Sequence, residues 1–302
     1  SIWVQLDDME VHRMRVPLDE VFAARNFVSM VSWEKLAGRD SRSVMSKTCD
    51  FVLVYSSSSL RFKNSRNLLP RDAVATASAY ANPDGDTRGP WTSGDFTAQF
   101  NPAENPRDSQ RYTLITPEGR SFDPPPGRCW LYTKDRYEEL VADNRVWFGE
   151  EGNNIPRLKR FLSELQDGLV PKTLWTHAEV GHNDLGKKEI QTLFTGQQPF
   201  STPKPERLLE RIIHIGSNPG DIVLDVFAGS GTTAAVAQKM GRRWVTCELL
   251  ESTFTMFTRP RLEKVVNNED PGGITRTKGE RVDATEEGLP DGVSPEDAAK
   301  FT

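Results

Sequence analysis

The stretch that decides the fold is Gly220-Asp221-Ile222-Val223-Leu224-Asp225-Val226-Phe227-Ala228-Gly229-Ser230-Gly231-Thr232-Thr233. Its apolar run, residues 222–224, has the length and composition of a buried parallel strand. Gly229 and Gly231 predict a tight loop, after which residues 232–240 form a helix and residues 243–247 a second strand. Strand, loop, helix and strand in this order predict a parallel βαβ unit.

The loop predicts a cofactor, but its glycines alone do not say which one. Gly229 to Ala234 also satisfy the looser dinucleotide fingerprint, so a nicotinamide or flavin enzyme is an alternative. Asp225 argues against it, because a carboxylate at the strand end repels a pyrophosphate. S-adenosylmethionine has no phosphate and carries an ammonium and a sulfonium group, which a carboxylate attracts. Glu248, which ends the next strand, is predicted to accept hydrogen bonds from two ribose hydroxyls.

The rest of the chain divides into an ordered start, an irregular middle and an ordered end. Apolar spacing predicts strands over residues 1–6, 27–33 and 51–55 and helices over residues 9–24, 205–217 and 251–266. The middle is punctuated by Pro, Gly, Asn and Asp, and only residues 158–166 and 185–194 have helical spacing. This texture predicts a separate domain inserted into an α/β sheet.

Composition sets further bounds. The last 36 residues carry nine acidic and four basic side chains, which accounts for the whole net charge of -5, so charge gives no support for DNA binding. No apolar run is long enough to span a bilayer, and no leader precedes the first strand, which predicts a cytoplasmic protein without membrane contact. The three cysteines are too far apart for a zinc site. His182 with Asp184 suggests an acid–base or metal pair, but a solvated turn is the preferred interpretation, and no metal is expected.

The run from Gly220 to Thr233 resembles the cofactor motif of bacterial DNA methyltransferases that modify exocyclic amines, with Val226 where that family usually has proline. The resemblance implies that S-adenosylmethionine contacts Asp225, Phe227, Ala228, Gly229, Ser230, Gly231, Thr232 and Glu248. The run from Thr202 to Leu208 resembles the preceding motif of the family, which implies that Lys204 and Pro205 contribute to the methionine end of the pocket.

The order of segments resembles modification subunits of type III restriction systems. It implies a circularly permuted, Rossmann-like methyltransferase sheet with an inserted target-recognition domain. The expected parts are residues 1–59, the second half of the catalytic region; 60–200, the insert; 201–266, the cofactor region; and 267–302, an acidic tail. The resemblance also implies double-stranded DNA as substrate and a restriction subunit and a homodimer as partners.

The methyl acceptor of this family is held by an Asp-Pro-Pro-Tyr type motif, which does not occur in the sequence. Asp123-Pro124-Pro125-Pro126 is the nearest string, but Gly127 stands where the aromatic residue belongs, so we reject it. By the family order the motif precedes Ser1. We therefore expect an N-terminally truncated adenine-specific DNA methyltransferase that is inactive by itself. A cytosine-specific enzyme and a noncatalytic fragment that binds DNA or cofactor are the alternatives.

The insert offers pairs of arginine and aromatic residues. Arginine can reach guanine edges or phosphates, and aromatic rings can wedge beside an extruded base. On this basis Arg88, Trp91 and Arg111 are candidate DNA contacts. The alternative for each pair is a small tryptophan core that arginines cover.

Overall fold

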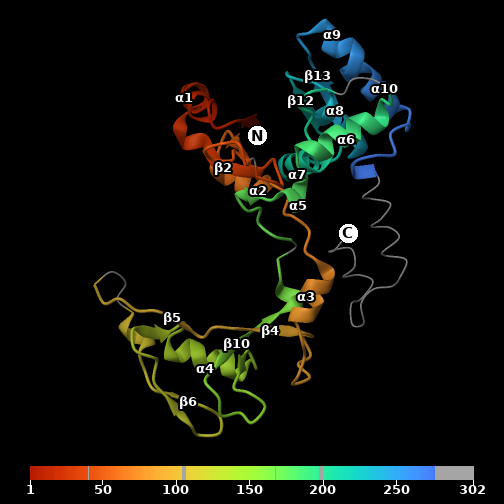
Figure 1. Ribbon diagram of the computed structural model, residues 1–302. Helices are drawn as coiled ribbons and strands as arrows, with labels where there is room; N and C mark the ends of the chain where they lie inside the picture. Colours follow the sequence, from red (N-terminus) through yellow and green to blue (C-terminus); the bar gives the residue numbers. More distant parts are fainter. Residues whose placement is uncertain (40, 104–106, 167, 197–199, 276–302) are drawn as a thin grey trace. The chain divides into compact units, whose positions relative to one another are not determined.

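The computed structural model describes residues 1–39, 41–103, 107–166, 168–196 and 200–275 (Figure 1). These residues form a mixed α/β protein with two compact units. The first contains residues 1–69 and the described chain from residue 169 onward; the second contains residues 70–168. In the described part of the chain, helices are too short or too polar to cross a membrane.

The first unit contains a four-stranded sheet in the order β1-β3-β2-β11. β3 (Cys49–Tyr55) pairs antiparallel with β1 (Ile2–Leu6) and with β2 (Phe27–Glu34), and the short β11 (Leu174–Trp175) runs parallel to β2. These bounds confirm the three predicted strands of this region. The central strand is apolar on both sides, which predicts that both faces of the sheet are covered.

Each face of β3 packs against a different helix. Leu53 and Tyr55 lie in a cluster with residues of α1 (Val11–Phe22). Val52 and Val54 lie in another cluster with Trp175 and with residues of α7 (Glu206–Gly216). The predicted helices at both places are confirmed. Three further helices complete this part: α2 (Ser59–Ser65), α5 (His177–Val180) and α6 (Asn183–Leu193).

The predicted βαβ unit is also present in the first unit. β12 (Ile222–Asp225) and β13 (Arg243–Thr246) are parallel neighbours, and α8 (Thr232–Lys239) connects them. The buried face of α8 consists of small residues, Ala234, Ala235 and Ala237 among them, so α7 and α10 can pack closely against it. This packing fixes the first turn of α8, where the glycine loop ends.

The predicted helix over residues 251–266 is confirmed, with one irregularity. It begins as α9 (Glu251–Thr253), continues as a π turn (Phe254–Thr258), and ends as α10 (Arg259–Val266). Single π turns inside helices are rare and frequently occur at functional sites. This one lies directly behind the glycine loop, because Thr258 Oγ1 donates to the Gly229 carbonyl over 2.7 Å.

The second unit consists of short strands around an aromatic core. Its elements are α3 (Ala73–Ala79), β4 (Trp91–Gly94), β5 (Thr97–Gln99), β6 (Leu114–Ile115), β7 (Ser121–Phe122), β8 (Arg128–Trp130), α4 (Lys134–Ala142), β9 (Val146–Trp147) and β10 (Arg157–Phe161). β10 lies between β4 and β9 in an antiparallel sheet, and β5–β8 and β6–β7 form two further pairs. Phe96, Leu114, Trp130 and Tyr137 are in its core. Residues 60–69 and 169–196 of the expected insert belong to the first unit in this structure.

One predicted helix is wrong. Residues 158–166 form the end of β10 and a 3-10 turn (Leu162–Glu164) instead. The apolar spacing of Leu158, Phe161 and Leu162 is helical, but the strand buries Lys159 as well. The charge is accommodated by partners far away in sequence, Asp84 and Asp86, so tertiary contacts override the local pattern.

Candidate cofactor site

The site begins where β12 ends at Asp225. The Asp225 carboxylate accepts the Phe227 N–H over 3.0 Å, and the Asp225 carbonyl accepts the Cys247 N–H over 2.9 Å. The Ala228 N–H in turn donates to the Cys247 carbonyl over 2.9 Å. The loop is therefore tied to the end of β13 at its start, and Asp225 fixes its direction.

Two glycines of the loop adopt conformations that favour glycine. Gly229 has φ +51° and Gly231 has φ +77°, both in the left-handed region. A Cβ on Gly229 would lie 3.3 Å from the Phe200 ring, and one on Gly231 would lie 3.4 Å from the Thr258 carbonyl. Gly231 is also the N-cap residue of α8. The backbone here can approach a ligand closely, next to the amide groups of a helix N-terminus.

Glu248 closes the loop from the next strand. Its Oε2 accepts the Gly229 N–H over 2.8 Å, and its Oε1 accepts the Leu250 N–H over 3.0 Å. A carboxylate oxygen can accept more than one hydrogen bond, so Glu248 can still receive a ligand hydroxyl. Asp225 and Glu248 thus hold the same loop from the ends of two parallel strands.

The two halves of the loop differ in exposure. Phe227 is 87% exposed, whereas Ser230 and Thr232 are buried and their hydroxyls lie 3.0 Å apart. Ala228, between them in sequence, is buried. The first half therefore presents an aromatic side chain and a carboxylate to a ligand, and the second half faces the interior of the first unit.

Lys204 and Pro205 precede α7. Pro205 is the N-cap residue of that helix and is buried against Gly181, where an added Cβ would lie 3.0 Å from the proline ring. The Lys204 ammonium lies 5.7 Å from the centroid of the Trp33 ring. Burial lowers the pKa of Lys204, and the neighbouring Asp50 opposes that shift. Trp33 belongs to β2 and Asp50 to β3, so Lys204 lies beside these strands, and its predicted contact with a cofactor stays a prediction.

Sequence reasoning missed a buried ionic network beneath the loop. Glu206, at the first turn of α7, binds Lys239 of α8 and Arg261 of α10 at 2.8–3.0 Å. Arg261 also reaches Thr232 Oγ1 at 2.8 Å. An arginine in a helix near a chain end is usually interpreted as a surface residue, and its partner lies 55 positions away. The sequence held no signal for it beyond the Lys-Pro-Glu step.

Metal chemistry finds no support in the described ranges, which contain no cluster of three or more His, Cys, Asp or Glu side chains. His182 is instead the N-cap residue of α6, and its Nδ1 accepts the Leu185 N–H over 3.4 Å. His182 and Asp184 therefore lie at the start of a helix rather than in a turn, and the absence of a metal stays an expectation.

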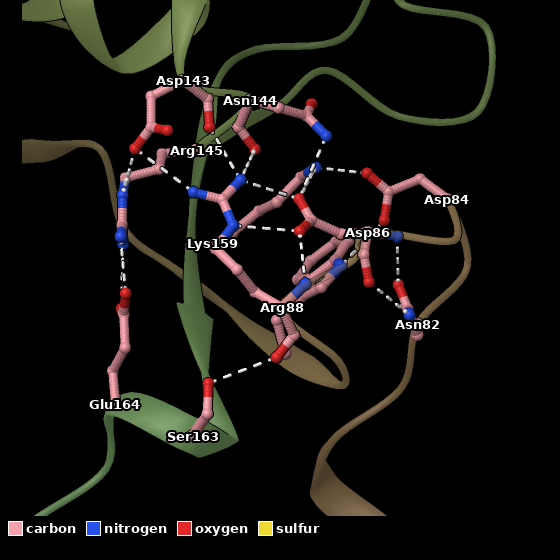
Figure 2. A network of polar contacts seen from close by, with 11 residues as sticks. Asn82, Asp84, Asp86, Arg88, Asp143, Asn144, Arg145, Lys159, Ser163 and Glu164 are labelled. Atoms are coloured by element: carbon pink, nitrogen blue, oxygen red, sulfur yellow. Dashed lines mark hydrogen bonds and ion pairs between the residues drawn. The ribbon is translucent and has the colours of Figure 1, made fainter.

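In the second unit, Arg88 belongs to a polar network (Figure 2). Its guanidinium binds both oxygens of Asp86 at 2.8–2.9 Å and the Asp143 carboxylate at 3.2 Å. The hydrogen bonds from Arg88 hold the pKa of Asp86 far below its usual range. The guanidinium also lies 4.4 Å from the centroid of the Phe161 ring. Its donors are committed to the protein, so Arg88 stabilises this unit in the structure.

The same network holds two further cations. Lys159 is fully buried, pairs with Asp84 and Asp86, and lies 5.4 Å from the Trp91 ring centroid. Arg145 binds Asp143 and Glu164. Arg88 and Arg145 both lie over the Phe161 ring, whereas Lys159 is the cation near the tryptophans.

Trp91 and Arg111 differ in accessibility. Trp91 is buried, donates to Asp84 over 2.9 Å, and lines a hollow of about 600 Å³ together with Trp147, Asn154 and Arg157. Arg111 is exposed and lies 4.7 Å from the centroid of the Phe100 ring. Of the three predicted DNA contacts, Arg111 has the most accessible side chain, and all three stay predictions.

Known proteins are similar to this chain over much of its length. Residues 1–259 match the N6/N4 methyltransferase family, described as DNA methylase. The chain is 32% identical over 236 residues to the type III restriction-modification enzyme StyLTI Mod subunit of Salmonella typhimurium strain LT2, covering 77% of this chain and 34% of that protein. It is 44% identical over 89 residues to DNA adenine methyltransferase YhdJ of Escherichia coli strain K12, covering 30% of each.

The matched region is only a part of each relative. The match spans about a third of the length of each of these two curated relatives. Among solved structures, PvuII DNA methyltransferase (cytosine-N4-specific) is 13% identical with a TM-score of 0.38, covering 87% of this chain and 63% of that chain.

Proposed function

The chain belongs to the N6/N4 DNA methylase family, and we propose that it is part of an enzyme that transfers a methyl group from S-adenosylmethionine to the exocyclic amine of adenine in a specific DNA site. The similarity to a type III Mod subunit supports the role of modification subunit in a restriction-modification system. A restriction subunit, a second copy of the chain and double-stranded DNA are the partners that this role implies.

The observation that carries the cofactor proposal is the pair of carboxylates on the glycine loop. Asp225 and Glu248 both accept loop N–H groups, so two negative charges lie next to the backbone that would contact a ligand. A dinucleotide would bring its pyrophosphate beside Asp225 and be repelled, whereas Glu248 can accept ribose hydroxyls of either cofactor. S-adenosylmethionine brings an ammonium, a sulfonium and ribose hydroxyls, which carboxylates attract. When bound, it supplies the methyl group.

Calorimetric titration with S-adenosylmethionine and with NAD tests this choice. We expect binding of the first and none of the second. Asp225→Asn keeps the size of the side chain and removes its charge, so we expect it to weaken the binding of S-adenosylmethionine. Binding of NAD by the unaltered chain, with no response to S-adenosylmethionine, would overturn the proposal.

The proposed target base is adenine, supported by the similarity to the adenine methyltransferase YhdJ. A catalytic pocket cannot enclose a base that is still stacked in a duplex, so the base must be extruded before reaction. Digestion of methylated DNA followed by mass spectrometry distinguishes N6-methyladenine from N4-methylcytosine. Detection of N4-methylcytosine would show that the target base is cytosine, and the rest of the proposal would stand.

We propose that the carboxylate that grips the acceptor amine lies outside residues 1–302, in the circularly permuted order described for the sequence. The exposed residues Ile222, Leu224 and Val226 support it, because they leave an apolar side of β12 uncovered by the described chain. The four-part division at residues 59, 200 and 266 is part of this proposal, and residues 276–302 of its acidic tail lie outside the described residues. We expect no methyl transfer by residues 1–302 alone. Incorporation of labelled methyl groups into DNA by this chain would contradict this expectation.

The second unit is proposed to read the DNA site, as an insert within the methyltransferase sheet. Its exposed Arg111 and the hollow beside Trp91 and Trp147 support this role. Arginine at a phosphate contributes to affinity and to its salt dependence, whereas arginine at a base edge contributes to sequence preference. DNA affinity measured at several salt concentrations with cognate and random duplexes separates the two.

A further inference from the structure

A buried ionic network lies directly beneath the glycine loop. Glu206 is 1% exposed and accepts hydrogen bonds from three directions. Lys239 donates at 2.9 and 3.0 Å, Arg261 at 2.8 Å, and the Ile274 N–H at 3.0 Å. Lys239 also binds Asp270 at 2.9 Å, so the network joins α7, α8, α10 and the residues after α10.

Arg261 connects this network to the loop. It is 1% exposed, and its two terminal nitrogens point to different partners. Nη2 donates to Glu206 over 2.8 Å, while Nη1 donates to Thr232 Oγ1 over 2.8 Å and to the Ser230 carbonyl over 3.4 Å. The Thr232 hydroxyl also shares a hydrogen bond with the Ser230 hydroxyl, with 3.0 Å between the two oxygens. A single guanidinium therefore fixes the second half of the loop against the start of α7.

Stability alone is a poor reason for this arrangement. Apolar side chains of similar volume often stabilise a core as well as a buried ion pair does. The Nε–H of Arg261 also has no hydrogen-bond partner among the residues that the structure describes, which adds a cost. A planar group with donors on two sides is suited instead to hold two partners at a fixed distance and angle.

A second contact from the same helical segment acts on the loop. Thr258, in the π turn one helical turn before Arg261, donates to the Gly229 carbonyl over 2.7 Å. The loop is thus held from behind at Gly229 and at Thr232, while its Phe227 side is exposed. The two attachment points flank Gly231, whose left-handed conformation turns the chain into α8.

We propose that Arg261, held by Glu206, is a positioning residue for the methyl-donor site. It sets the distance between the Ser230–Thr232 turn and α7, and so the shape of the loop that receives the cofactor. This inference rests on the proposed function, because it concerns the same site. It adds a residue that does not touch the cofactor.

Two conservative variants test it. Arg261→Lys keeps the charge near Glu206 but cannot reach both partners, and Thr232→Val keeps the shape and removes the acceptor. We expect each to raise the Kd for S-adenosylmethionine about tenfold, the size of one lost hydrogen bond to a charged group. The double variant should bind S-adenosylmethionine with nearly the same Kd as either single variant, because both substitutions remove the same contact. Independent, multiplying effects would overturn the assignment.

The matched control is Lys159→Met, which breaks an equally buried ion pair in the second unit. It should lower the stability of that unit and leave the Kd for S-adenosylmethionine unchanged. Because Thr232 is itself a predicted cofactor contact, the ligand-free hydrogen exchange of the loop in Thr232→Val is the test to use if Arg261→Lys fails to fold.

Hydrogen exchange distinguishes this inference from the proposed function. The amide N–H groups of residues 229–233 should exchange about tenfold faster in both variants without any ligand, beyond any change in the β3 amides, which report unfolding of the whole unit. If the unaltered chain does not bind S-adenosylmethionine, the proposed function fails but faster loop exchange still supports the positioning role. Unchanged loop exchange in folded variants would overturn the role of Arg261, whatever the cofactor.

Discussion

Replacement of Glu189 by glutamine should change how stability depends on pH. Glu189 lies on α6, and its Oε2 accepts the Glu206 N–H over 3.0 Å. Burial, and then the negative charge of Glu206, raise the pKa of Glu189 to about 7, while Arg261 and Lys239 oppose the shift. Glutamine keeps the size and an acceptor oxygen but cannot ionise. The variant therefore isolates the effect of charge.

The direction in which stability changes with pH follows from the pKa of Glu189 in the folded and in the unfolded chain. The folded protein keeps the Glu189 proton up to about pH 7, whereas the unfolded chain releases it near the ordinary value of 4.5. The contribution to stability is complete below pH 4.5 and is lost as pH rises through about 7. A shift of this size corresponds to about 3 kcal/mol of unfolding free energy.

Hydrogen exchange of β3 amides in a urea series measures the unfolding free energy of the first unit. Relative to the unaltered chain, Glu189→Gln should gain about 2–3 kcal/mol between pH 5 and pH 8. Glu20→Gln, at an exposed position on α1, is the control and should follow the unaltered chain. Parallel pH profiles for Glu189→Gln and the unaltered chain would refute the reasoning.

Three further substitutions probe other parts of the molecule. Asp86→Asn should lower the stability of the second unit by about 3 kcal/mol, because it leaves Arg88 and Lys159 short of a buried partner; thermal unfolding and limited proteolysis measure it. Arg111→Ala should weaken DNA binding and reduce its salt dependence without loss of stability, and an unchanged salt slope would remove Arg111 from the interface. Gly231→Ala should cost about 1–2 kcal/mol, because its φ of +77° strains an alanine, and should also weaken S-adenosylmethionine binding, as calorimetry can detect.

The sequence predicts the βαβ unit well because its signals are local. An apolar strand, two glycines and a helix follow one another within twenty residues, and the parallel pairing of β12 with β13 agrees. The loop residues are contiguous, so any fold that forms this turn brings Asp225 next to Gly229. Glu248 follows the end of β13 by two residues, and parallel strands place their carboxyl ends at one edge.

The sequence pattern could not predict ion pairs between residues that are far apart in the chain. Lys159 interrupts an apolar strand and is explained only by Asp84 and Asp86, more than 70 positions earlier. In the sequence Arg88 looks available for DNA, but in the structure its guanidinium binds the Asp143 carboxylate. Glu206 and Arg261 are ordinary helix residues in the sequence. Each of these pairs depends on tertiary packing, which spacing along one chain does not encode in a readable way.

The π turn at Phe254–Thr258 has a consequence for which length changes this region tolerates. Each residue of an α-helix turns the side chains that follow by about 100°, whereas a single π turn takes up one extra residue in about the same rotation. Deletion of one residue between Phe254 and Phe257 would therefore restore a regular helix and keep Arg261 close to its present phase. Deletion of one residue between Thr258 and Arg261 would instead rotate Arg261 away from Thr232. Rotational phase rather than helix stability thus decides which insertions and deletions this segment accepts.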